Sequence, residues 1–230
     1  MYQNYIFDLY GTLLDIRTDE WSDEVWDEFA KWLNARGVNK SKEALHNEYD
    51  ELVKKITSRP SMYAYPEIDI LPVFEKITTR ELAWEAGEAF RRFSTRFLKP
   101  YENTFKVLYT LKKAGKKIYL LSNAQKVFTM QELIKTGLIL YFDDIFISSE
   151  CGCKKPDKEF FNKLINKHNL DISQSIMIGN DGGSDIAGAK AVGMDAFYIR
   201  TEISPIGEPL PDCKYVYEDG DIGHVLDIVR

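Results

Sequence analysis

Six polar side chains in this sequence have the chemistry needed to bind and attack a small anion. They are Asp8, Ser122, Asn123, Lys155, Asp181 and Asp185. Carboxylate oxygens bind a hard cation such as Mg²⁺, which commonly keeps a substrate phosphate as a further ligand. A carboxylate can also act as a nucleophile and form a covalent intermediate. These residue types therefore predict chemistry on a small anionic substrate, provided that the fold brings them together.

The spacing of apolar residues predicts the elements that would position these side chains. Short apolar runs predict buried strands at 5–7, 118–121, 145–147, 175–178 and 196–199. Helical spacing predicts helices over 104–114, through Leu133, over 158–168 and over 186–192. Helices that alternate with short apolar strands are typical of βαβ units and a parallel sheet. Ligands bind at the carboxyl ends of such strands, where most of the six side chains are expected.

Residues 19–98 show a different pattern. Four stretches of helical spacing follow one another, from the stripe that begins at Trp21 to the stripe that ends at Phe97, and no strand pattern interrupts them. We therefore expect an all-helical domain over 19–98, inserted into an α/β core domain formed by 1–18 and 99–230. The predicted fold class is α/β, with a Rossmann-like parallel sheet in the core.

Composition excludes several classes of protein. The chain has 230 residues, 44% hydrophobic and 29% charged, and a net charge of −6. These values are near the average of globular proteins. A disordered chain would contain fewer apolar residues, so this class is excluded. The sequence contains no stripe of basic residues of the kind that binds nucleic acid, so nucleic acid is not expected as the partner. No apolar run approaches the roughly 20 residues that span a membrane. Three cysteines and the lack of a signal-peptide pattern favour a cytoplasmic location.

Four motifs in order resemble the haloacid dehalogenase superfamily of hydrolases. The first is Asp8-Leu9-Tyr10-Gly11-Thr12-Leu13, directly after the first predicted strand. The others are the strand ending in Ser122, the Lys155-Pro156 pair, and the acidic pair Asp181 and Asp185. The resemblance extends from about Tyr5 to Ile199. It implies a parallel-sheet core with an α-helical cap between the first and second motifs, in agreement with the pattern above.

The resemblance also implies a role for each residue. Asp8 would attack the substrate, and Thr12, Ser122 and Asn123 would bind the transferring group. Lys155 would neutralise charge on the nucleophile and on the intermediate. Asp181 would bind Mg²⁺ together with Asp8 and the main-chain carbonyl of Tyr10. Asp185 would be a further metal ligand or a support for Asp181 and Lys155.

Two positions depart from the phosphatases of the superfamily. Tyr10 stands where they usually carry a second aspartate as general acid and base, and a tyrosine with a pKa of about 10 is a poor base at pH 7. Asn180 precedes Asp181, where Gly-Asp is usual, so either Asn180 or Asp181 could occupy the metal position. We favour Asp181 because a carboxylate is a better Mg²⁺ ligand than an amide.

The departures leave three functions open. The most favoured is a Mg²⁺-dependent phosphatase of a small phosphorylated metabolite, with Asp8 as the nucleophile. Tyr10 instead favours carbon–halogen hydrolysis, because the haloacid dehalogenases themselves carry Asp-x-Tyr-Gly-Thr. Those enzymes need no metal, and they place an aromatic residue where this chain has Gly182-Gly183. The third possibility is a catalytically weak descendant that still binds phosphate.

Overall fold

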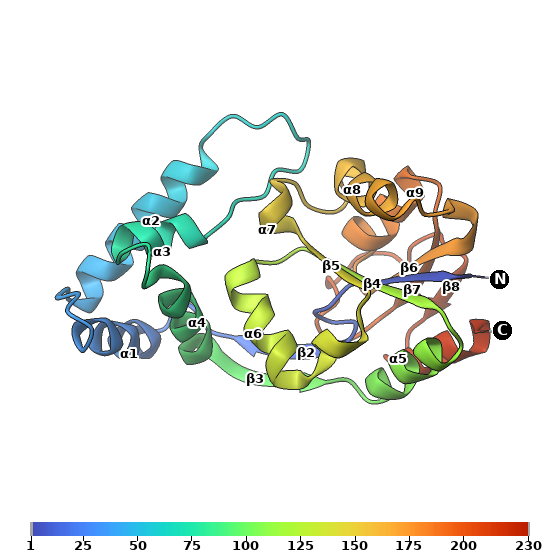
Figure 1. Cartoon of the computed structure of the whole chain (residues 1–230), viewed down its shortest axis with the longest axis horizontal. Helices are drawn as coiled ribbons and strands as arrows, with labels where there is room; N and C mark the ends of the chain where they lie inside the picture. Colours follow the sequence, from blue (N-terminus) through green and yellow to red (C-terminus); the bar gives the residue numbers. More distant parts are fainter. Residues whose placement is uncertain (1, 230) are drawn as a thin grey trace.

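Six strands form the central sheet in the order β5-β4-β1-β6-β7-β8, and all neighbouring pairs are parallel (Figure 1). The computed structural model describes residues 2–229. The first strand lies in the middle of the sheet, where Phe7 pairs with Leu120 and Ile178. The strands are β1 (Asn4–Phe7), β4 (Lys117–Ser122), β5 (Asp144–Ile147), β6 (Ser175–Gly179), β7 (Asp195–Ile199) and β8 (Tyr215–Tyr217). The predicted α/β class with a parallel sheet is confirmed.

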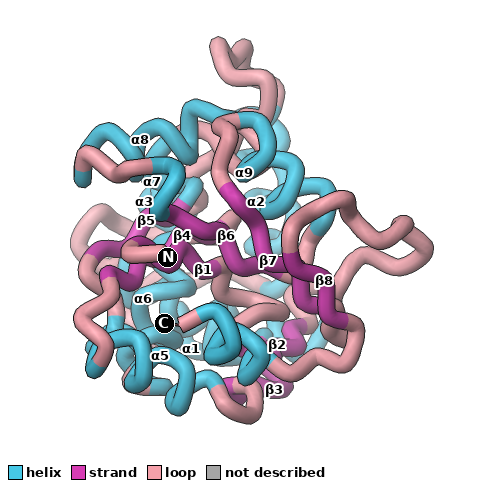
Figure 2. The backbone as a smooth tube through the Cα atoms, turned by 90° about the vertical axis from the view of Figure 1, so that its right-hand side faces the viewer, coloured by secondary structure: helices cyan, strands magenta, loops and turns pink. Residues whose placement is uncertain are grey.

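Helices cover both faces of this sheet because successive strand residues point to opposite sides. Tyr5 and Phe7 pack on one face with α5 and α6, whereas Ile6 packs on the other with α8 and α9. Figure 2 shows these two layers on opposite sides of the strands. The core helices are α5 (Thr104–Lys113), α6 (Lys126–Thr136), α7 (Ser148–Cys151), α8 (Lys158–His168) and α9 (Ala187–Ala191). Within residues 2–229, no helix combines the length and the apolar character that a membrane crossing requires.

Four further helices pack around a separate hydrophobic cluster and lie beside the sheet domain (Figure 1). They are α1 (Asp23–Asn34), α2 (Lys42–Thr57), α3 (Leu71–Ile77) and α4 (Ala83–Ser94). Aromatic side chains dominate their cluster, and Trp26, Phe29 and Phe90 are almost fully buried there. We refer to residues 19–94 as the cap. Its last helix also contacts α6 of the core, where Val127 and Phe128 join the same cluster.

The predicted last helix of the cap extends beyond the end of α4 at Ser94. Residues 95–98, which we expected in a helix, belong to strand β3 (Thr95–Pro100). This strand pairs antiparallel with β2 (Leu14–Thr18), so the two chain segments that connect the cap to the core lie side by side. The pairing supplies interstrand hydrogen bonds that a continued helix would lose, and tertiary context of this kind overrides local propensity. Strand β8 and helix α7 were also not predicted.

Candidate active site

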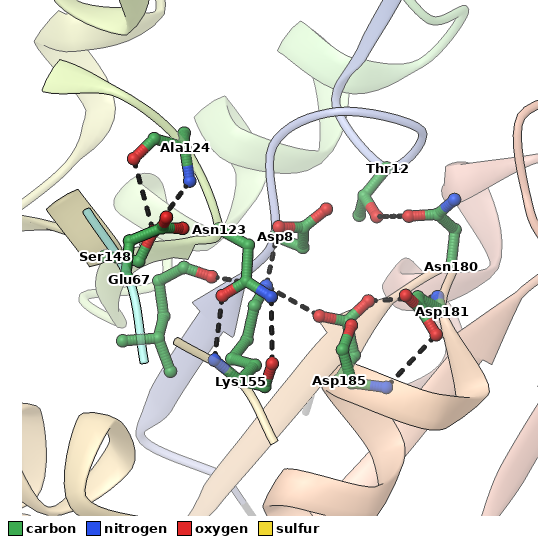
Figure 3. A network of polar contacts seen from close by, with 12 residues as sticks. Asp8, Thr12, Glu67, Asn123, Ala124, Ser148, Lys155, Asn180, Asp181 and Asp185 are labelled. Carbon is green, nitrogen blue, oxygen red and sulfur yellow. Dashed lines mark hydrogen bonds and ion pairs between the residues drawn. The ribbon is translucent and has the colours of Figure 1, made fainter. Parts of the chain in front are cut away.

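A buried lysine lies between two aspartates at the carboxyl end of the central strands (Figure 3). Lys155 Nζ is 2.6 Å from Asp8 Oδ1 and 2.6 Å from Asp185 Oδ1. Its third contact is the main-chain oxygen of Leu121, at 2.7 Å. The lysine side chain is 1% exposed, and the side chain of Asp8 is 11% exposed. Hydrogen bonds to Asp8 and Leu121 and the ion pair with Asp185 therefore hold the ammonium against the Asp8 carboxylate at one edge of the sheet.

Burial controls the electrostatics of this cluster. Removal from water disfavours the charged ammonium, but the two carboxylates outweigh that cost and raise the pKa of Lys155. Burial also raises the pKa of Asp185, with the Lys155 ammonium acting against the shift and the Asp8 charge adding to it. Lys155 thus stays positively charged at neutral pH. A cation held beside a nucleophilic carboxylate can stabilise a second negative charge delivered by the substrate.

Asn123 and Thr12 both form hydrogen bonds with other protein groups. The Asn123 amide accepts from the main-chain N–H of Lys155 (2.8 Å) and donates to its carbonyl (3.0 Å). The Thr12 hydroxyl donates to Asn180 Oδ1 at 3.2 Å. Asn123 thus holds the lysine loop while it lines the cavity described below, and Thr12 holds Asn180. That both side chains bind the transferring group stays a prediction.

Ser122, at the end of β4, differs from Asn123 and Thr12 because its side chain has no hydrogen-bond partner in the described chain. Its hydroxyl is fully buried and makes no hydrogen bond within the described part of the chain. An unpaired buried hydroxyl costs about 1–3 kcal/mol, so it needs a partner such as water, an ion or a ligand. The strand register places it only one residue beyond the level of Asp8. Of the three predicted anion-binding side chains, Ser122 is therefore the one whose hydrogen-bonding capacity is unused.

Asp185 and Asp181 hold each other at the end of β6. Asp185 Oδ2 accepts from the main-chain N–H of Asp181 at 3.0 Å. Asp181 Oδ1 caps the following turn by accepting from Gly183 and Ser184 (2.8 and 3.1 Å). Gly179 permits this packing, because a β-carbon there would lie 2.2 Å from Asp185 Oδ2. Asp185 is thus engaged at both oxygens, whereas Asp181 keeps one oxygen without a partner in the described chain.

Both the oxygen and the nitrogen of the Asn180 amide have partners within the protein. Its amide nitrogen lies 3.4 Å from the Ser204 hydroxyl, and its amide oxygen is bound to Thr12. Gly11 has a φ of +81°, and a β-carbon on it would come within 2.3 Å of the Asn180 amide. Gly11 is therefore required both by the turn and by this close approach. Since its oxygen already has a donor, Asn180 is the less available of the two candidates for the metal position.

The donor set fits Mg²⁺ in part. Asp8 and Asp181 each offer one carboxylate oxygen with no partner among residues 2–229, and the main-chain carbonyl of Tyr10 lies in the same loop as Asp8. These are hard oxygen donors, and Mg²⁺ commonly binds one or two carboxylates while water and substrate complete its shell. No group of three carboxylate, imidazole or thiolate side chains forms a metal cluster among those residues. Asp185 fits the supporting role better than that of a ligand, because both of its oxygens are engaged.

Tyr10 directs its hydroxyl to residues outside the Asp8–Lys155–Asp185 cluster. The hydroxyl donates a hydrogen bond to Glu132 of α6, and it lies 3.0 Å from the hydroxyl of Thr129. Burial, reinforced by the Glu132 charge, raises the pKa of Tyr10. The phenol therefore keeps its proton at neutral pH and is unsuited to act as a base.

A cavity of about 260 Å³ opens beside these side chains. Its polar wall includes Asp8, Asn123, Lys155, Asp181 and Asp185, and its apolar wall comes from Ile203 and Pro205. The loop that carries the two apolar residues is tied to the first motif, because the Thr201 hydroxyl donates to the Gly11 carbonyl at 2.8 Å. Sequence analysis missed this wall, since Ile203 and Pro205 lie in a segment without periodicity or motif.

The cap also reaches the site through its loop between α2 and α3. Glu67 in that loop accepts from the Ser148 hydroxyl (3.0 Å), which in turn accepts from the main-chain N–H of Ala124 (2.9 Å). Figure 3 shows this chain of contacts next to Asn123 and Lys155. Gln125 donates to the carbonyl of Ile68 at 2.9 Å and so fastens the same loop. No motif in the sequence marks Glu67 or Ser148.

Comparison with known proteins identifies the family of this chain. The family model described as haloacid dehalogenase-like hydrolase matches residues 2–193. Two relatives match almost the whole chain. A glyceraldehyde 3-phosphate phosphatase of Methanocaldococcus jannaschii is 25% identical over 100% of this chain and 98% of its own length. A phosphoglycolate phosphatase of Vibrio cholerae is 28% identical over 97% of this chain and 95% of its own length.

A further relative matches over a shorter stretch. A glyceraldehyde 3-phosphate phosphatase of Methanothermobacter thermautotrophicus is 31% identical over 46% of this chain, and the chain spans 47% of its length.

Solved structures share the fold at low sequence identity. The crystal structure of a HAD phosphatase from Thermococcus onnurineus superposes with a TM-score of 0.64, at 21% identity over 98% of this chain and 97% of its own. A 2-haloacid dehalogenase from Pseudomonas syringae superposes with a TM-score of 0.66, at 20% identity over 99% of this chain and 97% of its own. Phosphatases and dehalogenases thus share this architecture, and the fold alone does not distinguish them. The match over residues 2–193, together with the four motifs at one edge of the sheet, shows that this chain belongs to the haloacid dehalogenase-like hydrolases.

Proposed function

We propose that this protein is a Mg²⁺-dependent phosphatase that transfers the phosphoryl group of a small metabolite to Asp8 and then to water. The observation that carries the proposal is the Asp8 carboxylate, which Lys155 fixes through one oxygen while the other oxygen has no partner in the described chain. The names of the relatives support a phosphate ester as substrate. The cavity of about 260 Å³ lies below the ~300–1,000 Å³ of sites for drug-sized ligands, which favours a small substrate.

The proposed reaction uses the Asp8 carboxylate and the donors around it. The free oxygen of Asp8 attacks phosphorus, the P–O bond to the alcohol breaks, the departing alkoxide takes a proton from solvent water, and an aspartyl phosphate forms. Water then attacks phosphorus and loses a proton to solvent, and the P–O bond to Asp8 breaks, which releases phosphate and restores the carboxylate. The Lys155 ammonium and the Ser122 hydroxyl are the donors available for charge on the phosphoryl oxygens. Mg²⁺ bound by Asp8, Asp181 and the Tyr10 carbonyl would neutralise further phosphate charge.

Metal binding is a direct test of the ligand assignment. We expect wild-type protein to bind Mg²⁺ in calorimetry, and Asp181→Asn to weaken that binding by more than the ~10-fold typical of losing an outer-shell partner. The asparagine keeps one oxygen to cap the turn, so loss of affinity would report the lost charge. Asn180→Ala serves as the comparison. If Asn180→Ala weakens Mg²⁺ binding more than Asp181→Asn does, the metal position belongs to Asn180.

The choice between phosphatase and dehalogenase needs one panel of substrates. Phosphate monoesters, acyl phosphates and 2-haloacids would each be incubated with Mg²⁺ and, separately, with EDTA. We expect release of phosphate that depends on Mg²⁺ and no release of halide. Halide release that persists in EDTA would instead support the dehalogenase function that Tyr10 favours. Thermal stabilisation by phosphate with no turnover of any compound would support a binding protein.

Tyr10 predicts an unusual dependence on the leaving group. Without an aspartate at this position, protonation of the departing oxygen loses the ~10²–10⁴-fold that general acid catalysis supplies. We therefore expect p-nitrophenyl phosphate and acyl phosphates to be hydrolysed at least ~10²-fold faster than alkyl phosphates. Tyr10→Asp should increase kcat/KM for alkyl phosphates more than for activated ones.

Tyr10→Phe is the control for that measurement. It removes the hydroxyl and keeps the ring, so it should leave the ratio of activated to alkyl rates unchanged. Wild-type rates that do not vary with leaving-group pKa would show that another residue supplies the proton.

A further inference from the structure

A second buried charged cluster contacts Tyr10, two residues after Asp8. Arg91 of cap helix α4 donates from Nε to Glu132 Oε1 of core helix α6 at 2.7 Å. The same guanidinium donates from Nη1 to Glu20 Oε1, also at 2.7 Å. The side chains of Arg91 and Glu132 are only 10% and 4% exposed. This cluster therefore joins the cap to the core through charges that water does not screen.

The cluster ends on Tyr10. The second oxygen of Glu132 accepts a hydrogen bond from the Tyr10 hydroxyl. The Arg91 guanidinium carbon lies 5.8 Å from the centre of the Tyr10 ring and 5.3 Å from that of Phe128. Both the hydroxyl and the ring of Tyr10 are thus held by groups that belong to the cap–core junction.

Tyr10 in turn is part of a tightly closed turn. We call residues 8–14 the nucleophile loop. The main-chain N–H groups of Leu13 and Leu14 both donate to the Leu9 carbonyl (2.8 and 2.9 Å), and Gly11 donates to the Leu14 carbonyl (2.8 Å). Because the loop is closed by its own hydrogen bonds, displacement of the Tyr10 ring shifts the backbone two residues from Asp8.

We propose that Glu132 and Arg91 are positioning residues that act through Tyr10 to hold the nucleophile loop and couple the cap to Asp8. The inference rests on the proposed role of Asp8 as nucleophile. Tyr10 stands where the phosphatases carry an acid–base aspartate. Its hydroxyl instead anchors the nucleophile loop through the hydrogen bond to Glu132. A nucleophile misplaced by about 1 Å can lose ~10²-fold in rate, so loss of the anchor should lower kcat rather than raise KM. Lys155 and Ser122, which would bind the phosphoryl group, do not belong to this cluster.

A double-mutant cycle on kcat tests the route through Tyr10. Glu132→Gln in the wild-type background should lower kcat by roughly 10- to 100-fold with KM nearly unchanged. In the Tyr10→Phe background the same substitution should change kcat less than about 3-fold, because the link is already absent. Glu85→Gln is the matched control, since it breaks an Arg–Glu pair of the cap with Arg36 that is exposed to solvent. Equal effects of Glu132→Gln in both backgrounds would overturn the proposal.

Amide hydrogen exchange gives a readout that does not depend on activity. Glu132→Gln and Tyr10→Phe should each increase exchange at Leu13 and Leu14 while leaving β4 unchanged, and Glu85→Gln should change neither. Faster exchange over the whole core would indicate a general structural brace and would overturn the proposal. Should Glu132→Gln unfold the protein, Tyr10→Phe alone still decides the matter, because it removes the anchor without leaving a buried charge unpaired. If exchange at Leu13 and Leu14 increases as expected but the protein shows no phosphatase activity, the proposed function is refuted. The role of Glu132 and Tyr10 in holding the nucleophile loop is then still supported.

Discussion

Asp8→Asn is expected to abolish phosphate release while leaving the fold intact. The amide has the shape of the carboxylate and can still accept the Lys155 hydrogen bond through its oxygen, but it is not a nucleophile. We expect kcat/KM for p-nitrophenyl phosphate to fall at least ~10⁴-fold, in the range seen when a principal catalytic group is removed from other hydrolases. Initial-rate kinetics would be paired with circular dichroism and thermal unfolding of the same sample.

The matched control is Asp19→Asn, the same chemical change at an exposed carboxylate that lies 3.6 Å from Arg96. Its turnover should equal that of the wild type. Retained turnover in Asp8→Asn with an unchanged circular dichroism spectrum would show that another group attacks the substrate. The whole assignment of the cavity would then have to be revised, because Lys155 and Asp185 are ordered around Asp8.

The sequence was most informative about the strands and the residues that follow them. Apolar runs such as 175–178 are short and bounded by turn residues, so they predict buried strands, and polar residues after such strands must meet at one edge of a parallel sheet. This reasoning brought Asp8 and Asp185 to the same place before any side chain was positioned. The loop Lys154-Lys155-Pro156 was placed near this edge from its position before a predicted helix, but only the resemblance to a motif assigned the role to Lys155, because a lysine before a proline in a loop carries no periodic signal.

Local pattern could not predict which partner each polar side chain chooses. Asn123 was predicted to bind the substrate, but no pattern in the sequence indicated that its amide also forms two hydrogen bonds with the Lys155 main chain. Glu132 fits the pattern of an ordinary solvated glutamate on a helix, and only tertiary packing brings it against Arg91. The helix prediction for residues 95–98 was wrong for the same reason, because their partner strand β2 lies about 80 residues earlier in the chain.

Lys155→Met is expected to have the largest effect on stability. Removing the ammonium leaves Asp8 and Asp185 facing each other in a buried site without a cation, and breaking a buried ion pair in this way costs about 3–5 kcal/mol. The matched control is Lys126→Met, whose partner Glu150 is exposed, where a loss of about 0–1 kcal/mol is expected. Urea denaturation at pH 7 measures both differences. Equal losses in the two variants would contradict the buried-charge account.

The pH dependence of that loss identifies its cause. In the Lys155→Met protein, the pKa of Asp185, already raised by burial and by the Asp8 charge, would rise further because the opposing ammonium is gone. A raised carboxyl pKa favours folding at low pH and loses its contribution as pH rises, so the variant should be closer to wild type in stability at pH 5 than at pH 8. Adding Asp185→Asn to Lys155→Met should recover stability at pH 8 without recovering turnover, because the phosphoryl charge would still lack its cation. Recovery of turnover together with stability would mean that Lys155 serves only to neutralise Asp185.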